Sequence, residues 1–372
     1  MNKRVIDGVL KDWGDRLFYS RVRGKKGRNV LGGQGGGKLP AAPASGQRGG
    51  PATRDRLART LNKTPEVMVK ITGGGKNMRQ IETHLRYISR EGGVELEDEN
   101  GDRHAGIDEV LEVRDGWAKG KIGIRPDGVT KMADGNSRKE AFNIMLSMPP
   151  GTDRESVTAA ARSFAKQLFG NHQYVFAAHA DEEHPHVHLA VKAVDRDGVR
   201  LRPRKADLQH WRETFAEKLM EQGIAANATP RRTRGIVRKA EKQAVVHINK
   251  DYEAGKRPAP ARTTQRQLAD AERELASGER RQNPAKAHID ANRKDTVQSF
   301  GKIARALAAG DGEDKKLALR IVEFVRAMPA TTTRHDALVR AIQARKSQNA
   351  ELERGQGREP GREAGTGRAT DQ

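Results

Sequence analysis

The chain of 372 residues contains no cysteine, which excludes disulfide bonds and thiolate-ligated metal sites. Aromatic residues make up only 4% of it, so a stacking platform for single-stranded bases would be sparse. No apolar run is long enough to span a membrane, and the N-terminus carries acidic residues where a signal peptide has an apolar core. These absences indicate a cytosolic protein that is not inserted into a membrane.

Acidic residues are comparatively few, because 49 Asp and Glu stand against 70 Lys and Arg, giving a formal net charge of +21. This excess predicts a polyanionic partner, with nucleic acid ahead of a membrane surface. Residues 1–60 alone hold fourteen Lys and Arg against four Asp. Within them, residues 24–51 are rich in glycine and cannot bury enough apolar surface to offset their chain entropy, which predicts disorder. A short helix is expected at residues 6–19.

The apolar periodicity predicts an α+β fold, with a largely antiparallel central sheet of about five strands flanked by helices. Residues 94–138 are polar and irregular, and we interpret them as an insertion with one short helix near residues 110–119. The strands are expected at 66–72, 141–149, 174–179, 186–194 and 199–203, and the longer helices at 78–91, 152–169 and 207–222.

Changes in composition divide the chain into four segments. Residues 1–65 are expected to form a basic, Gly-rich extension that is mostly disordered. Residues 66–235 are expected to form the folded domain, and residues 236–350 a charged helical region. Residues 351–372 are rich in Gly and Arg, which predicts a disordered tail.

Histidine is concentrated at one place, because four of the eleven histidines fall within ten residues, in the string AAHADEEHPHVHLAVKAVD. His186 and His188 flank one apolar residue at the start of an apolar run. Alternate residues of a strand point to the same face, so these two imidazoles project together. The loop after His179 is six residues long, so a hairpin brings that residue opposite or near His186. Three neutral imidazoles then converge.

Imidazole suits several divalent metals, so the ligands alone do not select the ion. Three protein ligands leave open coordination positions, as catalytic sites require. His184 precedes a proline in the loop and is a fourth ligand, a proton carrier or an exposed side chain. Asp181 and Glu183 could orient a ligand histidine by hydrogen bonding. The alternative interpretation is that the histidines are surface residues on a hairpin.

The string HADEEHPHVHL resembles the third motif of conjugative relaxases of the mobilisation type, a family that includes the T-DNA border endonucleases. These enzymes belong to the wider His-hydrophobic-His endonuclease group, whose fold the resemblance implies here. In the family, the first histidine of the motif and its last two bind the metal. The matching residues are His179, His186 and His188. The family's acidic residue two positions after the first histidine matches Asp181, which we expect to be catalytic.

The segment GGGKNMRQIETHLRYISREGGVEL resembles the first motif of the same family, with a strand, a Gly-rich turn and a helix that bears a tyrosine before Ser-Arg-x-Gly. The resemblance implies that Tyr87 is the nucleophile. Thr83, His84 and Glu91 lie three or four residues from it and could share its helix face. Without the second motif, Tyr87 would read as an amphipathic helix residue at the edge of a core.

The segment AFNIMLSMPPGTD is similar to the family's middle region, which contacts DNA near the nick, so Ser147 is a candidate DNA contact. The alternative is a strand-end serine that caps a turn. Residues 199–243 hold twelve Lys and Arg against five acidic residues, in clusters suited to a DNA backbone. Arg202, Arg204 and Lys205 are the candidate contacts there, against the alternative of a solvated charged surface.

The resemblance implies a nick made at one strand and one site of a plasmid or mobile-element transfer origin. Tyr87 would attack the phosphodiester and form a 5′-phosphotyrosyl intermediate, so that the nick can be resealed by the reverse attack. A tyrosine hydroxyl is ordinarily protonated at neutral pH, so the metal or a base among Asp181, His184 and His84 must activate it. The implied cofactor is Mg²⁺ or Mn²⁺, with Zn²⁺ as the alternative.

The implied partners are single-stranded or supercoiled DNA at the transfer origin, the coupling protein of a type IV secretion channel and relaxosome accessory proteins. The implied location is the bacterial cytoplasm, with transfer of the protein to the recipient cell together with the DNA. The Arg- and Gly-rich C-terminus is similar in composition to relaxase tails that a secretion channel recognises.

Three other functions remain open on the sequence. A non-catalytic DNA-binding mobilisation accessory protein would use the histidines structurally. A rolling-circle replication initiator belongs to the same endonuclease group, but places its histidines before its tyrosine. A metal hydrolase of the His-x-His-x-Asp kind needs an aspartate after the histidine pair, where Leu189 and Ala190 stand.

Overall fold

The computed structural model describes residues 2–19, 50–119, 123–124, 137–237, 241–280 and 283–356. The chain forms two compact units. The first comprises Met1–Arg234 with Thr296–Met328, and the second comprises Gly235–Asp295 with Pro329–Gln372. No described helix is both long enough and apolar enough to cross a membrane.

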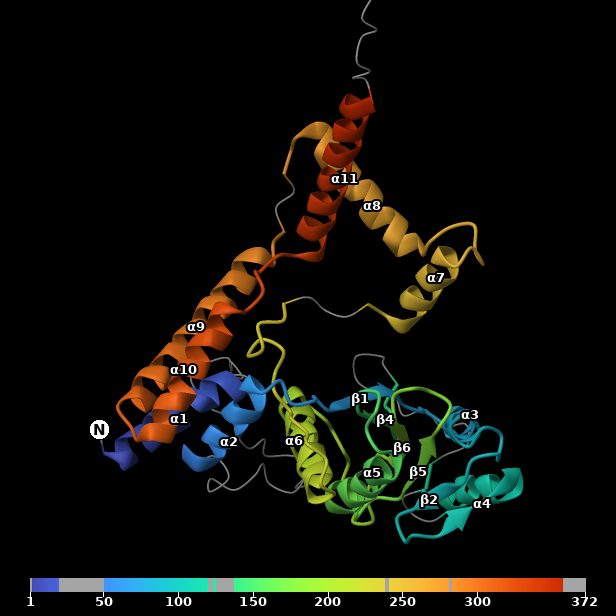
Figure 1. Ribbon diagram of the computed structural model, residues 1–372. Helices are drawn as coiled ribbons and strands as arrows, with labels where there is room; N and C mark the ends of the chain where they lie inside the picture. Colours follow the sequence, from blue (N-terminus) through green and yellow to red (C-terminus); the bar gives the residue numbers. More distant parts are fainter. Residues whose placement is uncertain are drawn as a thin grey trace, which may run out of the picture. The chain divides into compact units, whose positions relative to one another are not determined.

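A six-stranded antiparallel sheet forms the centre of the first unit, with the strand order β1-β4-β6-β5-β2-β3 (Figure 1). This sheet confirms the predicted α+β fold. Its strands are β1 (Met68–Gly73), β2 (Leu96–Asp98), β3 (Arg103–His104), β4 (Ala141–Ser147), β5 (Tyr174–His179) and β6 (His186–Lys192).

Two parts of the sheet differ from the sequence-based expectation. The strand expected at residues 199–203 is wrong, because only the isolated bridge between Val194 and Arg200 forms there. The chain then turns away, and Asp207 accepts a hydrogen bond from the backbone N–H of Arg204 at the start of the next helix. Conversely, β2 and β3 come from the segment interpreted as an irregular insertion, and they extend the sheet beyond β5.

Helices cover the two faces of the sheet unequally. The face formed by Leu189 and its apolar neighbours packs against α5 (Arg154–Phe169) and α6 (Lys205–Glu221), and all of this core is buried. The opposite face packs against α3 (Met78–Ile88) and α4 (Gly106–Ala118), which cover β2, β5 and part of β6. Helix α5 begins at Asp153, whose carboxylate accepts from the N–H of Ser156, and not at the expected Thr152.

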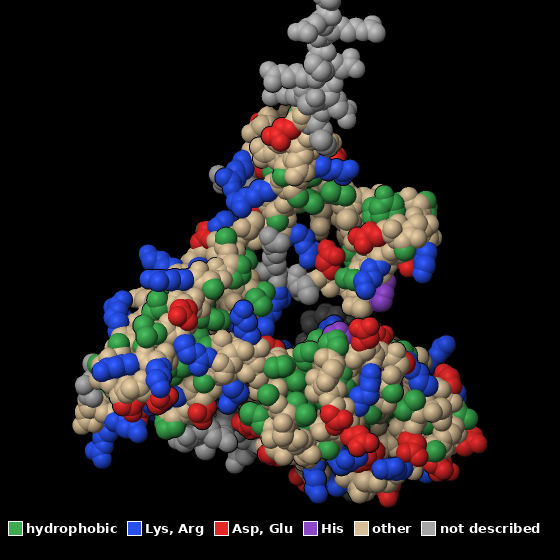
Figure 2. Space-filling model, viewed as in Figure 1, with side chains coloured by type: hydrophobic (Ala, Val, Ile, Leu, Met, Phe, Trp, Pro, Cys, Tyr) green, Lys and Arg blue, Asp and Glu red, His purple; other side chains and the backbone are tan. Residues whose placement is uncertain are grey.

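A second core joins the two ends of the first unit. The helices α1 (Lys3–Phe18), α2 (Gly50–Leu61), α9 (Lys286–Ala308) and α10 (Gly312–Arg326) pack around Leu10, Leu57 and Phe300. In the view of Figure 2, Lys and Arg side chains are spread over these helices. Helix α1 corresponds to the short helix expected near the N-terminus, whereas α2 was not foreseen. The Gly-rich segment expected to be disordered lies mostly outside the described residues.

Polar contacts attach this bundle to the sheet domain. Arg56 of α2 forms an ion pair of 3.0 Å with Glu213 of α6, and both side chains are mostly buried. The hydroxyls of Thr60 and Thr229 are 3.0 Å apart. Residues 1–65 and 236–350 are expected from composition to be separate regions, but parts of both belong to this unit.

The second unit is helical, as the sequence pattern predicts. It contains α7 (Gln243–Glu253), α8 (Arg262–Ser277) and α11 (Arg334–Gln356). His335 of α11 and Glu274 of α8 pair at 2.7 Å.

Candidate active site

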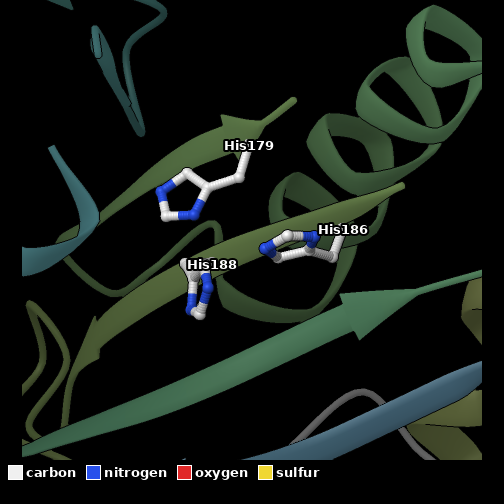
Figure 3. A group of neighbouring side chains, drawn as sticks. All are labelled: His179, His186 and His188. Atoms are coloured by element: carbon white, nitrogen blue, oxygen red, sulfur yellow. The ribbon is translucent and has the colours of Figure 1, made fainter. Parts of the chain in front are cut away.

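Three histidines meet at the ends of β5 and β6. His179 pairs directly with His186 in the antiparallel register, and His188 lies two residues further along β6 on the same face. Their candidate ligand nitrogens all lie within 4.8 Å of one another. Figure 3 shows the three rings projecting from the two strands toward a common space. The spacing therefore brings together the three residues expected from the sequence.

Hydrogen bonds leave these imidazoles suited to a metal ion. His179 Nε2 lies 2.7 Å from the carbonyl oxygen of Ile88, which can only accept, so Nδ1 is left as the lone-pair nitrogen. His186 Nδ1 donates to the carbonyl of His184 at 2.9 Å, which leaves Nε2. The buried Nδ1 of His188 has no hydrogen-bond partner among the described residues. Backbone carbonyls that orient ligand imidazoles are typical of metal sites.

The electrostatics agree with this donor set. Burial, together with the neighbouring His179 and His186, lowers the pKa of His188 to about 3. Burial also lowers the pKa of His179, although its hydrogen bond to Ile88 opposes the shift. Both imidazoles are therefore neutral at neutral pH, which is the form that binds a metal. His184 is exposed in the loop, and its backbone carbonyl, not its ring, reaches the cluster.

Helix α3 brings Tyr87 to the histidines. The Tyr87 ring meets the His188 ring edge-on, with 5.8 Å between their centroids. Tyr87 is 53% exposed, so its hydroxyl is accessible to a large substrate. The helix sits on this face because Met78, Ile81 and Leu85 are buried against the sheet at helical spacing.

His84 and Glu91, which were expected to share the helix face of Tyr87, differ in what they contact. His84 stacks near Tyr87 with 6.2 Å between the ring centroids, and its buried Nε2 has no partner among the described residues. Burial lowers the pKa of His84 to about 4. Glu91, by contrast, binds Arg86 at 3.1 Å. Only the histidine therefore joins the tyrosine.

Asp181 contacts an arginine that the sequence analysis did not single out. Its carboxylate pairs with Arg90, and this pairing lowers the pKa of Asp181. Arg90 Nη2 also lies 3.2 Å from His179 Nδ1, and its guanidinium carbon lies 5.2 Å from the Tyr87 ring centroid. The signal for Arg90 was the Ser-Arg-x-Gly sequence after the tyrosine, which was used only to locate Tyr87.

The candidate DNA contacts are not all near the histidines. Ser147 pairs with His186 across β4 and β6, but it is buried and its hydroxyl donates to the carbonyl of Met148 at 3.3 Å. Arg202, Arg204 and Lys205 are exposed. They follow the far end of β6, roughly 20 Å along a seven-residue strand from His186.

An open surface adjoins the histidines on the other side. On β1, Met68 and Lys70 are exposed while Val69 is buried, so one face of this strand is uncovered. The register connects Met68 through Ser147 to His186, and Lys70 through Met145 to His188. Both exposed residues are two strands from the triad, about 10 Å away on the same face. We call this surface, formed by Met68, Lys70 and Met145, the β1 shelf.

Comparisons with known proteins indicate one family. Residues 102–224, which contain the three histidines but not Tyr87, match the model of the relaxase family described as MobA/VirD2-like, nuclease domain. The T-DNA border endonuclease VirD2 of Rhizobium radiobacter is 30% identical over 188 residues, covering 46% of this chain and 43% of that protein. The VirD2 proteins of Agrobacterium fabrum and Rhizobium rhizogenes are each 29% identical over 188 residues.

The chain matches less than half the length of each of these relatives. No solved structure matches the chain. The family resemblance expected from the tyrosine and histidine motifs is confirmed by these matches. Residues 102–224 are therefore similar to the nuclease domain of MobA/VirD2-like relaxases.

Proposed function

We propose that this protein is a DNA relaxase that makes a site- and strand-specific nick at the transfer origin of a plasmid or mobile element. The observation that carries the proposal is the exposed Tyr87 beside His188, on a face where three imidazoles converge. A tyrosine nucleophile needs an accessible hydroxyl and a nearby site for the phosphate. The juxtaposition of Tyr87 and the triad supplies both.

His179, His186 and His188 would hold a divalent cation, with Mg²⁺ or Mn²⁺ as the first candidates. When bound there, such an ion supplies Lewis-acid polarisation of a non-bridging phosphate oxygen. The hydroxyl oxygen of Tyr87 attacks the phosphorus and forms a P–O bond, while the bond to the 3′ oxygen breaks. The 3′ oxygen takes up a proton from the solvent and leaves as a hydroxyl, the proton of Tyr87 passes to a base, and the phosphate at the 5′ end remains attached to Tyr87. The number of ester bonds is unchanged, so the reverse attack reseals the strand.

His84 is the favoured acceptor of the Tyr87 proton among the three candidate bases. Its ring stacks near the tyrosine, and it is neutral at neutral pH because burial lowers its pKa to about 4. Asp181 is engaged by Arg90, and His184 is exposed in the loop. A neutral imidazole beside the nucleophile is a common arrangement for general-base catalysis.

The β1 shelf is the proposed path of the target strand next to the nick. Lys70 would contact a phosphate, and the exposed Met68 would contact a base or sugar. Arg202, Arg204 and Lys205 would contact the strand at the far end of the sheet. Transfer of the DNA would involve a type IV coupling protein and accessory proteins, and would begin in the bacterial cytoplasm.

The experiment that tests this function uses the purified full chain and a single-stranded oligonucleotide that carries the candidate transfer origin of the same element. With Mg²⁺ or Mn²⁺, we expect a covalent protein–DNA adduct on a denaturing gel. Tyr87→Phe and EDTA should each abolish it, because one removes the nucleophile and the other the cation. Tyr252→Phe, which changes another exposed tyrosine in the second unit, should leave it intact.

Each other outcome has a distinct meaning. An adduct that survives Tyr87→Phe would assign the nucleophile to another tyrosine. Binding without cleavage or adduct would favour the accessory-protein function. An adduct that is formed without any divalent cation would contradict the metal site.

A further inference from the structure

Arg90 occupies the point where the proposed catalytic groups meet. Its guanidinium pairs with Asp181, has Nη2 3.2 Å from His179 Nδ1 and lies against the ring of Tyr87. A cation bound at His179 Nδ1 would replace that contact with Nη2, because the nitrogen has one lone pair. Tyr87 lies on α3, three residues before Arg90, whereas His179 and Asp181 come from the end of β5 and the following loop. The contact of Arg90 with these two residues is therefore a long-range contact. A cation at this junction attracts an anionic substrate toward Tyr87.

Two contacts of Arg90 use the same guanidinium nitrogen, and a third is made with the Tyr87 side chain. Both hydrogen bonds, to His179 and to Asp181, are made by Nη2. A guanidinium carries five N–H donors in a planar fork, so donors remain that are able to bind the two oxygens of a phosphate. The Arg90 side chain is 37% exposed, so a ligand can reach it.

The backbone around Arg90 is unusual. Arg90 and Glu91 have φ values of 50° and 56°, and Gly92 follows with 88°, so three consecutive residues are left-handed. A side chain with a Cβ rarely adopts this conformation, which costs about 1–2 kcal/mol per residue. The turn is held in place because Arg86 and Ser89 provide the carbonyls that bind the N–H groups of Glu91 and Val94. It directs Arg90 back over α3 toward Tyr87.

We propose that Arg90 is a catalytic residue that binds the scissile phosphate and stabilises the negative charge that develops on its non-bridging oxygens as Tyr87 attacks. Asp181 then acts on Arg90, as the carboxylate that holds the guanidinium in place, and not as a base for Tyr87. The proposal rests on the proposed relaxase function and adds a specific residue to it. Charge-assisted, bidentate hydrogen bonds to phosphate are the interaction for which arginine is best suited.

The first test measures single-turnover formation of the adduct by Arg90→Gly. Glycine adopts the left-handed backbone of this position without strain, so the variant keeps the turn. We expect the rate to fall roughly 10²–10³-fold, as for other lost donors to a transition-state oxyanion. Affinity for Mn²⁺, measured by calorimetry, should not fall by more than about threefold, because Arg90 is not a proposed ligand and its removal frees His179 Nδ1 for the cation. The control is Arg86→Ala and not Arg86→Gly, because Arg86 lies inside α3, where glycine would destabilise the helix.

Arg86→Ala removes a guanidinium from the same helix whose partners are Glu82 and Glu91. It should form the adduct within about twofold of the wild-type rate. Added guanidinium ion should restore the activity of Arg90→Gly at least about tenfold, because the free cation can occupy the vacated position, and should not affect Arg86→Ala. A purely structural role of Arg90 would not give this rescue.

A binding experiment tests the contact with phosphate directly. In a Tyr87→Phe background, a neutral methylphosphonate replaces the phosphate at the nick mapped by the wild-type adduct. The substitution should weaken binding about tenfold when Arg90 is present and have little effect when Arg90→Gly is added. Equal effects in both proteins would overturn the proposal, as would an unchanged cleavage rate, a loss of Mn²⁺ affinity that matches the loss of rate, or no rescue. A wild-type protein that forms no adduct would instead refute the proposed function, and the role of Arg90 with it.

Discussion

His188 and Leu189 are neighbours on β6, but they belong to different parts of the molecule. Leu189 belongs to the hydrophobic core that α5 and α6 cover. His188 points to the face that α3 covers only in part, beside Tyr87 and His179. One face of the sheet is thus devoted to stability, whereas the other combines a small core with a reactive site. Since residues alternate along a strand, the two can be changed independently.

We call the face that contains Leu189 the closed face and the face that contains His188 the reactive face. The largest change in stability is expected from a substitution on the closed face. Leu189→Ala removes buried methyl groups from a core that helices seal on one side and the sheet on the other. We expect the free energy of unfolding of the first unit to fall by about 2–5 kcal/mol, measured by urea denaturation. Mn²⁺ affinity of the folded variant should be unchanged. A loss of metal binding under folding conditions would mean that the two faces are coupled.

His188→Gln is the matched change on the reactive face. It removes one of three proposed ligands, and we expect Mn²⁺ affinity to fall by roughly 100-fold or more. The stability of the metal-free protein should change by less than about 1 kcal/mol, because Nδ1 of His188 has no partner among the described residues that the substitution would leave unpaired. Titration calorimetry and urea denaturation of the same preparation measure both quantities. A variant that binds Mn²⁺ normally would exclude His188 as a ligand.

The closed face was the more predictable of the two. Its residues on β4, β5 and β6 are apolar at alternate positions or in continuous runs, and such patterns depend only on local sequence. The triad could also be predicted, because a hairpin fixes the register of His179 with His186. Strands β2 and β3 are two or three residues long, too short to leave a periodic pattern.

Long-range features of the structure were not predictable in the same way. Helix α2 is buried against α1 and α10, and α10 lies far along the sequence. The amphipathic pattern of α2 is short, so the sequence alone did not distinguish this helix from the Gly-rich segment before it. Arg90 depends on three left-handed residues after α3, two of which are not glycine. Nothing in the local sequence required that turn. The separation of Arg202 from the triad likewise depends on the direction of β6.

Acid should lower the free energy of unfolding through protonation of His84 on the reactive face. Burial lowers the pKa of His84 to about 4, so the folded state keeps this imidazole neutral, while the unfolded chain takes up a proton below about pH 6.5. Stability is therefore fully present above pH 6.5 and is lost as the pH falls toward 4. In His84→Gln, the free energy of unfolding should decrease between pH 7 and pH 4 by about 1–2 kcal/mol less than in the wild type, after allowance for solvent screening. Urea denaturation between pH 4 and 7, in the presence of EDTA, measures the effect.

The control for this prediction is His184→Gln, which changes an exposed histidine of the same unit. It should leave the pH dependence of stability close to that of the wild type. If His84→Gln has the same pH dependence as this control, burial does not keep the imidazole of His84 neutral in acid. The basis for choosing His84 as the acceptor of the Tyr87 proton would then be lost.

The smallest effect concerns the β1 shelf, and it compares the two ends of the sheet. Lys70→Ala should weaken binding of a short oligonucleotide that spans only the nick by a few-fold, and lower its salt dependence by about 0.7 in the logarithmic slope. Arg202→Ala should have no effect on this oligonucleotide, because Arg202 lies beyond the far end of β6. On a longer oligonucleotide, both substitutions should weaken binding if the strand crosses the sheet. Each substitution removes a single proposed phosphate contact, so both effects are small. If Lys70→Ala and Arg202→Ala lower the affinity for the short oligonucleotide equally, the strand does not follow the β1 shelf.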